Sequence, residues 1–529
     1  MTKLIARITP HIPTIALCVI LLLGAYLRLY RISEYMTFLG DEGRDMLVIK
    51  RMIVDHTFTL LGPTASVGGF FLGPIYYYFM LPFVWASGLN PAGAAVMVAL
   101  FGIGTIYLVY RLGRDICDQW VGLTAAALYS VSPLVIAYSR SSWNPNLVPF
   151  FSTLLVLLLW HSVAKKNPNL LFWVGVVLGI GLQLHYLFLF LFPVVGIWYL
   201  VYGRSVGWFK YYLLGVIGFI IGYGPFLAFE LRHGFPNTIS IINFLREGEG
   251  TGLVSVTFWK NITDVSYRLF GRLVFRLPPP EQWVNIPDFA QYVWAAGTKF
   301  SIFVSLGLLL AYGTRFLKVP WKKKTQAEDD PHPLYGVVLF LVWFIIPVLL
   351  FGFYKKGIYD YYFGLFFALP FVLTALVLRS VRLHWVGKTA TLVIVAGLLY
   401  LNWEGRPFKF QPNNQLGQAQ MIAKAAYDKT GGNPYNFALL TQSNSDHVYR
   451  YFFEIWGNPP VAIENAQKDP GRKSVTEQLI IICEERECKP LGHPLWEIAG
   501  FGRAEIDGEW PVSFVRVMRL VHYKGEEAK

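Results

Sequence analysis

Long apolar runs dominate the chain from residue 12 to residue 403. The first run, residues 12–30, has about the length that crosses a hydrocarbon core of roughly 30 Å. Ten further runs follow at residues 92–111, 120–137, 147–164, 170–185, 187–202, 211–229, 300–317, 334–353, 361–379 and 389–403. This pattern predicts a polytopic α-helical membrane protein with about eleven transmembrane helices.

Basic residues predict how the helices are oriented. Lys3 and Arg7 precede the first run, and later Lys and Arg clusters fall in alternate connections, so we expect these connections and the N-terminus to be cytoplasmic. The Tyr-rich stretch 72–87 contains Gly and Pro, and we interpret it as a re-entrant or interfacial helix, because a full span there would invert every later loop. The outer segments are then 31–91, 138–146, 230–299 and 354–360, and the expected location is the cell (inner) membrane.

The composition changes abruptly after Asn402. We therefore divide the chain into a transmembrane domain, residues 1–403, and a small extracytoplasmic α/β domain, residues 404–529. Strands are expected at 437–441, 479–483 and 512–520, and a helix at 417–428. Cys483 and Cys488 are close enough to pair, which would be typical of an extracytoplasmic compartment; two unrelated thiols explain them equally well.

Composition narrows the function classes. The 529 residues include 46 Lys plus Arg and 33 Asp plus Glu, a net charge of +13, yet only 15% are charged and 54% are hydrophobic. Soluble domains average about 25% charged residues, so a soluble enzyme and a disordered protein are excluded. The basic residues lie in short clusters between apolar runs, which excludes a nucleic-acid binder as well.

Four ionisable residues follow the first apolar run closely, in the segment Phe38-Leu-Gly-Asp41-Glu42-Gly-Arg44-Asp45. Adjacent carboxylates beside an Arg can supply a general base whose ionised form the cation favours. The alternative is a helix start, in which the acidic residues stabilise the positive N-terminal end of the helix.

Two further outer segments carry groups suited to a sugar or a phosphate. Arg140 and Asn144 lie in a run of hydroxyls and amides that could hold a polar ring, or that could form a capped turn at the interface. Lys355 and Lys356 lie outside, against the usual charge bias, and could bind a lipid phosphate. Interfacial snorkelling of the two lysines is the alternative.

Other polar residues are harder to assign. His185 lies between two apolar runs and is either a ligand or a hydrogen-bonded helix end. Arg268, Arg272 and Arg276 have fourfold spacing, so on a helix they would share a face that attracts an anionic headgroup or rests on anionic lipid. No spacing of His and carboxylate residues is typical of a metal site, so no metal ligand is assigned.

The order of these features resembles that of a known family. One membrane helix, an outer loop with an Asp-Glu pair and an apolar Pro-Tyr-Tyr segment are similar to the GT-C membrane glycosyltransferases of the protein O-mannosyltransferase type, glycosyltransferase family 39. That family is related to the aminoarabinose transferases that modify lipid A. The resemblance covers roughly residues 10–400 and leaves the tail unassigned.

The resemblance implies roles for individual residues. Asp41 takes the place of the catalytic base, with Glu42 as its neighbour. Gly73 stands where relatives have a phosphate-contacting Lys, and Phe71 and Leu72 occupy the region of an acidic metal ligand found in some relatives. The substrate-binding residues assigned from the motifs and polar loops together are Arg44, Asp45, Tyr76, Tyr77, Arg140, Asn144, His185, Lys355, Lys356, Tyr361 and Tyr362.

The function implied by the resemblance is inverting transfer of a hexosyl or pentosyl group from a polyprenyl-phosphate-linked donor to a hydroxyl acceptor on the outer face of the membrane. The expected partners are this donor, the acceptor and membrane lipids, with no nucleic acid. The cofactor is left open, and a divalent metal is compatible with the chemistry. The alternatives are a lipid or sugar transporter or flippase, which predicts charged mid-membrane residues and internal symmetry, and an envelope receptor without catalysis.

Overall fold

The computed structural model describes residues 11–65, 68–202, 209–247, 255–278, 287–318, 333–382 and 385–525. Its contacts divide the chain into two compact units. Unit 1 comprises residues 1–30, 59–82 and 95–411, and unit 2 comprises residues 31–58, 83–94 and 412–529. The predicted cytoplasmic residues Lys3 and Arg7 lie outside the described residues.

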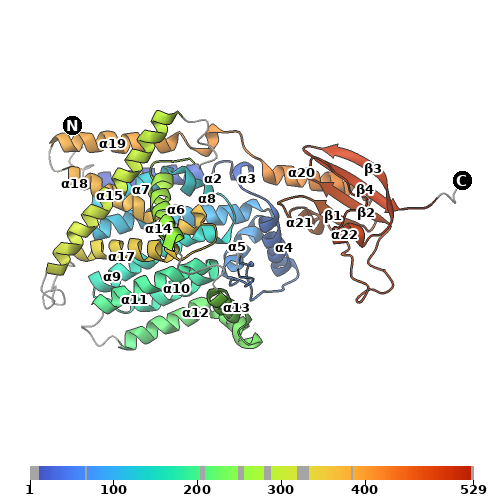
Figure 1. Cartoon of the computed structure of the whole chain (residues 1–529), viewed down its shortest axis with the longest axis horizontal. Helices are drawn as coiled ribbons and strands as arrows, with labels where there is room; N and C mark the ends of the chain where they lie inside the picture. Colours follow the sequence, from blue (N-terminus) through green and yellow to red (C-terminus); the bar gives the residue numbers. More distant parts are fainter. Residues whose placement is uncertain are drawn as a thin grey trace. The chain divides into compact units, whose positions relative to one another are not determined.

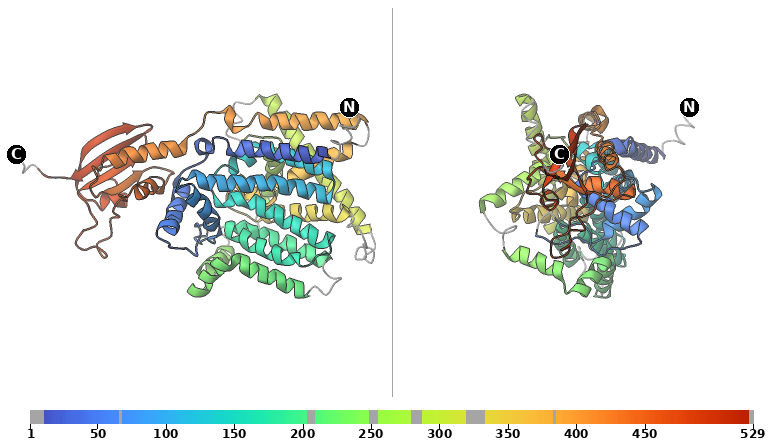
Figure 2. Two further views of the ribbon diagram at one scale, coloured as in Figure 1. Left: turned by 180° about the vertical axis from the view of Figure 1, so that it is seen from behind. Right: turned by 90° about the vertical axis from the view of Figure 1, so that its right-hand side faces the viewer.

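Unit 1 is helical, and most of its helices run side by side in both views (Figures 1 and 2). Residues 83–94, which comprise the end of α5, the connection that follows it and the start of α6, belong to unit 2. The elements are α2 (Ile12–Leu29), α5 (Ile75–Ala86), α6 (Ala92–Ile116), α7 (Gln119–Val131), α8 (Pro133–Tyr138), η2 (Asn144–Leu147), α9 (Val148–Ala164), α10 (Leu170–Leu184), η3 (Tyr186–Phe190), α11 (Leu191–Tyr202), α12 (Phe209–His233), α13 (Pro236–Glu247), α14 (Ser255–Leu273), α15 (Asp288–Lys318), α17 (Pro333–Gly352), η6 (Asp360–Phe366), α18 (Ala368–Val381), α19 (Trp385–Trp403) and η7 (Pro407–Lys409).

The predicted class of polytopic helical membrane protein is confirmed, but the count of about eleven spans is not. Among the described residues, six helices are long and apolar enough to cross a membrane: α2, α6, α9 with its preceding turn, α12, α17 and α19. A seventh is possible if η6 and α18, which are bent by 62°, form one span. With 12 residues, α5 is about 18 Å long and too short to cross by itself.

Three expected spans are interrupted. The run 120–137 breaks into α7 and α8 at Ser132, whose extended backbone precedes Pro133, because proline disfavours a helical conformation in the residue before it. The run 170–185 matches α10, whereas the next run, 187–202, is divided into the single turn η3 and α11; His185 is extended at the boundary between these two expected spans. The run 361–379 is bent between η6 and α18. The run 300–317 falls within the longer α15.

Glycines allow α10 and α12 to pack closely. A Cβ atom added at Gly175 would lie 1.9 Å from the carbonyl oxygen of Gly215, and one at Gly222 would lie 2.3 Å from the carbonyl oxygen of Val176. Such small residues, spaced four apart at Gly175 and Gly179 and at Gly218 and Gly222, let membrane helices approach through their backbones.

Unit 2 is an α/β unit built on a four-stranded sheet of order β1-β2-β4-β3; its strands are labelled in Figure 1. Its strands are β1 (Asn436–Leu440), β2 (Gln478–Cys483), β3 (Ala504–Val512) and β4 (Val515–His522), and its helices are α3 (Ile32–Tyr35), α4 (Gly40–Val54), α20 (Gln415–Asp428), α21 (His447–Ile455) and α22 (Trp496–Ala499). Strands β1 and β2 are parallel, and β4 is antiparallel to β2 and β3. The predicted strands at 437–441 and 479–483 and the helix at 417–428 therefore match β1, β2 and α20.

The predicted strand 512–520 is wrong in its limits. A turn at Ser513, with φ of 55°, separates β3 from β4, and β3 was not predicted. As an edge strand, β3 is largely half-buried or exposed and carries Glu505, Asp507 and Glu509, so it lacks the apolar alternation on which the prediction depended. Cys483 at the end of β2 and Cys488 are joined by a disulfide bond, which settles the choice that the sequence left open.

Candidate active site

The acidic segment after the first membrane helix forms the start of α4, in unit 2. Leu39, the residue before the helix, has no side-chain acceptor for the unpaired N–H groups of the first turn. Glu42 supplies one from three residues ahead: its Oε2 accepts a hydrogen bond of 3.0 Å from the Leu39 backbone N–H. The helix-start alternative is therefore correct as a description of the local structure, and it does not exclude a catalytic role for Asp41.

Exposure separates the three carboxylates of this segment. The side chain of Asp41 is 58% exposed, whereas Asp45 is fully buried and Glu42 is 7% exposed. Arg44 lies between two of them: its Nη1 donates to Asp41 Oδ1 at 2.9 Å, and its Nη2 donates to Asp45 Oδ1 at 2.8 Å. Asp45 is thus placed to orient Arg44, and Asp41 is the carboxylate of the group that solvent, or an acceptor, can reach.

Burial changes the protonation of Glu42. Its pKa is raised from 4.5 to about 7, mainly by loss of solvent; hydrogen bonds from the Leu39 and Glu42 backbone N–H groups oppose this rise, and the negative charges of Asp45 and Asp41 add to it. Glu42 is therefore largely protonated in mildly acidic solution, and it does not compete with Asp41 as a base there.

The sequence did not point to the residues of the C-terminal domain that pack on α4. The segment Thr441-Gln-Ser-Asn444-Ser445-Asp446 follows β1 and lies against the start of α4, where the Gly40 N–H donates to Asn444 Oδ1 at 3.0 Å. His447 begins α21, and its pKa is lowered overall. Burial is the main cause; the charges of Arg44 and Arg450 act in the same direction, and those of Asp446 and Asp41 oppose it. A polar run after a buried parallel strand was the available signal, because ligand-binding loops of α/β sheets gather at that end of the strands.

In unit 1 the structure brings together several of the predicted substrate-binding residues. The ring of Tyr361 lies 4.5 Å from Trp143 and 5.9 Å from His185 between ring centroids. Tyr362 packs on both of its neighbours, 4.5 Å from Tyr361 and 5.3 Å from His185. Trp143 and Tyr361 are half-buried, and His185 and Tyr362 are buried, so this aromatic cluster joins three segments that are distant in sequence.

The other predicted aromatic and amide residues of unit 1, Tyr76, Tyr77 and Asn144, contact segments next to this aromatic cluster or one another. The hydroxyl of Tyr76 is 2.7 Å from Ser142 Oγ, and the Tyr77 ring packs 6.2 Å from that of Tyr76. Asn144 Nδ2 donates to the Leu184 carbonyl at 2.7 Å, at the end of α10. All are buried, and their roles in substrate binding stay predictions.

The loop that carries Lys355 and Lys356 is held at both ends while the two lysines remain exposed. At one end Asn261 Nδ2 donates to the Tyr354 carbonyl at 2.6 Å. At the other end Asp360 is paired with two arginines of α14. The two pairs are Arg268 Nη1 to Asp360 Oδ1, at 3.1 Å, and Arg272 Nη2 to Asp360 Oδ2, at 3.0 Å. The loop is thus anchored at both ends, and its two exposed lysines lie between the anchored residues.

The structure corrects the prediction that Arg268, Arg272 and Arg276 share one helix face, because α14 ends at Leu273 and Arg276, with φ of 53°, lies beyond it. Arg268 and Arg272 bind a carboxylate of the same unit instead of presenting a free basic face to an anionic headgroup. Arg276 donates from Nη1 to the Leu401 carbonyl at 3.2 Å. All three arginines thus bond to groups of the same unit.

Arg140 occupies a helix end. It is 2% exposed, and its guanidinium donates to the carbonyl oxygens of Leu27, Arg28 and Tyr30 at 2.8, 3.1 and 2.9 Å. A cation at the last carbonyls of α2 stabilises the negative end of that helix. The contacts shown are therefore those of a C-cap, and a role of Arg140 in substrate binding stays a prediction.

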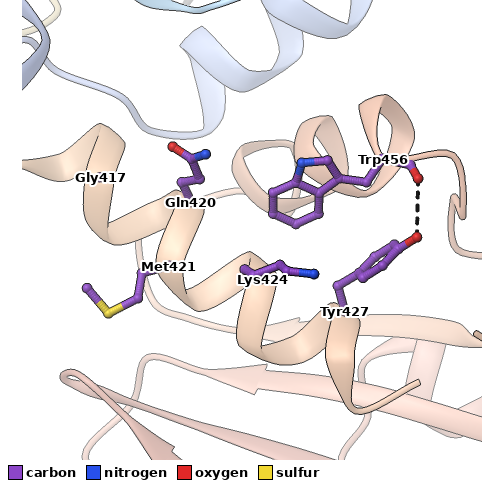
Figure 3. A pocket seen from close by; sticks show the side chains of 6 residues that line it. All are labelled: Gly417, Gln420, Met421, Lys424, Tyr427 and Trp456. Carbon is purple, nitrogen blue, oxygen red and sulfur yellow. Dashed lines mark hydrogen bonds between the residues drawn. The ribbon is translucent and has the colours of Figure 1, made fainter. Parts of the chain in front are cut away.

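Unit 2 also has an open hollow of about 650 Å³ on α20 (Figure 3). It is lined by Gly417, Gln420, Met421, Lys424, Tyr427 and Trp456. The ammonium of Lys424 lies 5.2 Å from the Tyr427 ring centre and 5.8 Å from that of Trp456, and 2.7 Å from Asp428 Oδ1. None of the predicted site residues lines this hollow.

Metal ligands are not evident. Within the described ranges, no group of three or more His, Cys, Asp or Glu side chains is arranged to hold a metal ion. A metal requirement is therefore a question for the transfer assay.

Comparison with known proteins identifies the fold. A family model described as dolichyl-phosphate-mannose-protein mannosyltransferase matches residues 73–228. The crystal structure of ArnT from Cupriavidus metallidurans bound to undecaprenyl phosphate is similar at 12% identity and a TM-score of 0.55, over 97% of this chain and 98% of that chain. Its apo state gives 11% identity and a TM-score of 0.58, over 96% and 97%. The chain therefore has the fold of a GT-C membrane glycosyltransferase.

The predicted resemblance is thus confirmed. Oligosaccharyltransferase AglB from Archaeoglobus fulgidus, in complex with an inhibitory peptide and a dolichol-phosphate, is a more distant match at 14% identity and a TM-score of 0.46, over 90% of this chain and 70% of that chain. No curated protein sequence matches significantly. The family match begins after Asp41 and ends before Lys355, so it includes only part of the predicted site.

Proposed function

We propose that this protein transfers a sugar from a polyprenyl-phosphate-linked donor to a hydroxyl acceptor on the outer face of the membrane, with inversion at the anomeric carbon. The observation that carries the proposal is the exposed carboxylate of Asp41, held by Arg44 at the start of α4 beside two buried carboxylates. A general base needs access to the acceptor and a fixed position, and Asp41 alone in this group combines the two.

In the proposed reaction Asp41 removes the proton of the acceptor hydroxyl. The acceptor oxygen then attacks the anomeric carbon from the side opposite the phosphate, and a new glycosidic bond forms as the bond from that carbon to the phosphate oxygen breaks. The electron pair of the broken bond leaves with polyprenyl phosphate. Glycosidic transfer by a single displacement inverts the anomeric configuration.

The leaving phosphate gains negative charge as the bond breaks, so a fixed cation nearby would stabilise the transition state. We assign this role to Lys355 and Lys356, which the anchored loop between Tyr354 and Asp360 presents. The half-buried ring of Tyr361 and its aromatic neighbours provide flat apolar faces of the kind on which sugar rings pack. ArnT of Cupriavidus metallidurans, whose fold this chain shares, has been crystallised with undecaprenyl phosphate, which supports a donor of this class.

An outer-face location is supported by the disulfide bond between Cys483 and Cys488. Disulfide bonds form and persist in oxidising compartments and are rare in the cytosol. The basic clusters between apolar runs also favour a cytoplasmic N-terminus and an extracytoplasmic C-terminal domain in the cell (inner) membrane.

The test is transfer from synthetic polyprenyl-phosphate sugars by the purified full chain in detergent, with and without divalent metal. Asp41→Asn should abolish transfer because it keeps the shape and removes the base. Asp428→Asn is the matched control, since Asp428 is an exposed carboxylate of the same unit, and it should transfer at the wild-type rate. Wild-type rates in correctly folded Asp41→Asn protein would refute the assignment.

The donor site has its own variant. Lys355→Ala combined with Lys356→Ala should raise the donor KM several-fold, because two phosphate-binding charges are lost. Lys468→Ala combined with Lys473→Ala removes two exposed lysines from unit 2 and should leave the donor KM unchanged. Equal donor KM values for the two double variants would favour snorkelling as the role of Lys355 and Lys356.

A further inference from the structure

The start of α4 is fixed by a hydrogen bond from a residue 404 positions away. The backbone N–H of Gly40, next to Asp41, donates to Asn444 Oδ1 at 3.0 Å. The same oxygen accepts the Ser445 N–H at 2.9 Å. The Leu39 side chain has no group that could accept a hydrogen bond from the first turn of α4. Asn444 supplies this acceptor from a distant segment, whereas in most helices the residue directly before the helix supplies it.

Asn444 is itself held by Glu484, the residue that follows β2. Its Nδ2 donates to Glu484 Oε1 at 2.9 Å. The hydroxyl of Tyr449 donates to the same Oε1 at 2.7 Å, and Thr441 Oγ1 donates to Oε2 at 2.7 Å. Burial and the charge of Glu484 raise the pKa of Tyr449, so its hydroxyl stays protonated and keeps donating. The amide orientation of Asn444 is thereby determined by a carboxylate that only accepts.

Two glycines bring α4 onto this support. A Cβ atom added at Gly40 would lie 2.4 Å from Ser445 Cβ, and one at Gly43 would lie 2.6 Å from the His447 carbonyl carbon. Gly40 and Gly43 are three residues apart and so share one face of α4, and Asp41 and Arg44 each follow one of them. The helix face beside the acidic group therefore lies in backbone contact with the segment after β1.

We propose that Asn444 and Glu484 are positioning residues of the transfer reaction: through the Gly40 N–H they set the place of the Asp41 carboxylate. The inference rests on the proposed function, in which Asp41 is the base. It gives the C-terminal domain a part in catalysis, namely holding the first turn of α4 in one position. Neither residue contacts the reacting atoms in this scheme.

The expected size follows from how steeply catalysis depends on geometry, since a misplacement of about 1 Å can cost about 100-fold in rate. Asn444→Ala leaves the Gly40 N–H without this acceptor and removes one of the three side-chain donors to Glu484. We expect kcat to fall about tenfold, with the donor KM within about twofold of wild type, because the loss concerns positioning of the base and not donor binding.

Asn436→Ala is the matched control for domain stability. Asn436 is 1% exposed at the opposite end of β1, donates to the carbonyls of Val461 and Ser474 at 2.8 and 2.9 Å, and accepts the Thr476 N–H at 2.8 Å. It loses at least as many hydrogen bonds as Asn444→Ala but does not contact α4. Its thermal midpoint should fall as far or further, while kcat of the folded protein stays at the wild-type value.

A compensating pair gives a second measurement. Asn444→Asp alone sets a carboxylate against Glu484, so two acceptors face each other, and kcat should fall more than about tenfold. Adding Glu484→Gln restores a donor, because the new amide can donate to the new carboxylate, whose other oxygen still accepts the Gly40 N–H. The double variant should regain kcat to within about threefold of wild type.

The experiment is steady-state transfer by the full chain in detergent for these variants beside Asp41→Asn. Loss of kcat in Asn444→Ala and its recovery in the Asn444→Asp, Glu484→Gln pair support the inference. If Asp41→Asn is inactive but the Asn444 variants keep wild-type kcat, or lose no more than Asn436→Ala, the inference is overturned and the proposed function stands. If Asp41→Asn is as active as wild type, Asp41 is not the base and the inference falls with that assignment; if the folded wild type transfers no sugar from any donor, the proposed function itself fails.

Discussion

Glu42 makes the stability of unit 2 depend on pH in a direction unusual for a carboxylate. It is buried at the first turn of α4, and burial raises its pKa from 4.5 to about 7. The folded chain therefore keeps a proton between pH 4.5 and 7 that the unfolded chain releases. Since stability falls with rising pH wherever the folded state binds more protons, this contribution is complete below pH 4.5 and is lost by about pH 7.

The size follows from the same pKa. One pKa unit corresponds to about 1.4 kcal/mol, so the difference between 4.5 and about 7 is equivalent to about 3 kcal/mol. Glu42→Gln keeps an oxygen that can accept the Leu39 N–H and stays neutral at every pH. We therefore expect wild type and Glu42→Gln to be similar at pH 4.5 and the variant to be more stable, by about 3 kcal/mol, at pH 8.

Hydrogen exchange of the α4 amides is the suitable assay, because it reports local opening of one helix in a protein of two units. A difference of about 3 kcal/mol corresponds to about a 100-fold change in the opening equilibrium. Protection would be measured from pH 5 to pH 8 after correction for the intrinsic exchange rate. In the wild type, protection of α4 should fall with pH, and in Glu42→Gln it should not.

Glu464→Gln is the control, as the same chemical change at an exposed carboxylate of unit 2. It should keep the pH dependence of the wild type. Parallel pH curves for wild type and Glu42→Gln would show that Glu42 is not protonated in the folded chain, and the argument from burial would then be wrong.

Two further variants test the packing of the site. Gly43→Ala would place a Cβ 2.6 Å from backbone atoms at the start of α21, so it should lower the unfolding free energy by about 1–3 kcal/mol and reduce transfer. Gly397→Ala is the control: a Cβ there has nothing within 4 Å, and the thermal midpoint should stay unchanged or rise. Asp360→Asn removes the charge that pairs with Arg268 and Arg272, so the loop that carries Lys355 and Lys356 should be held less firmly. Donor titration should show KM raised about tenfold with kcat unchanged. An unaltered KM would contradict the anchoring role of Asp360.

The membrane helices could be predicted where a single continuous apolar run forms a single helix. This holds for α2, α6, α12, α17 and α19, because the requirement to keep polar groups out of the hydrocarbon acts locally along the chain. The interruption at Ser132 was missed, whereas the break at His185 falls between two runs that were expected as separate spans. A short extended residue between two apolar helices leaves hydropathy almost unchanged, although Pro133 was a usable local signal.

The soluble part shows the same division. Strands β1 and β2 are buried along their whole length and were predicted from their apolar runs. Edge strand β3 has no buried residue and mixes apolar and acidic residues on its exposed positions, and its pairing with β4 depends on a partner strand that a local pattern does not contain.

For the site, the sequence by itself determined that Asp41, Glu42, Arg44 and Asp45 form one group, because they are neighbours in the chain. Only the tertiary structure decided which carboxylate is exposed, which one retains a proton and what holds the helix start. The helix start is held by Asn444 and Glu484, more than 400 residues away, and the burial of Glu42 and Asp45 likewise exists only in the folded chain. Burial and long-range pairing are properties of the packed chain, whereas adjacency and hydropathy are properties of the sequence itself.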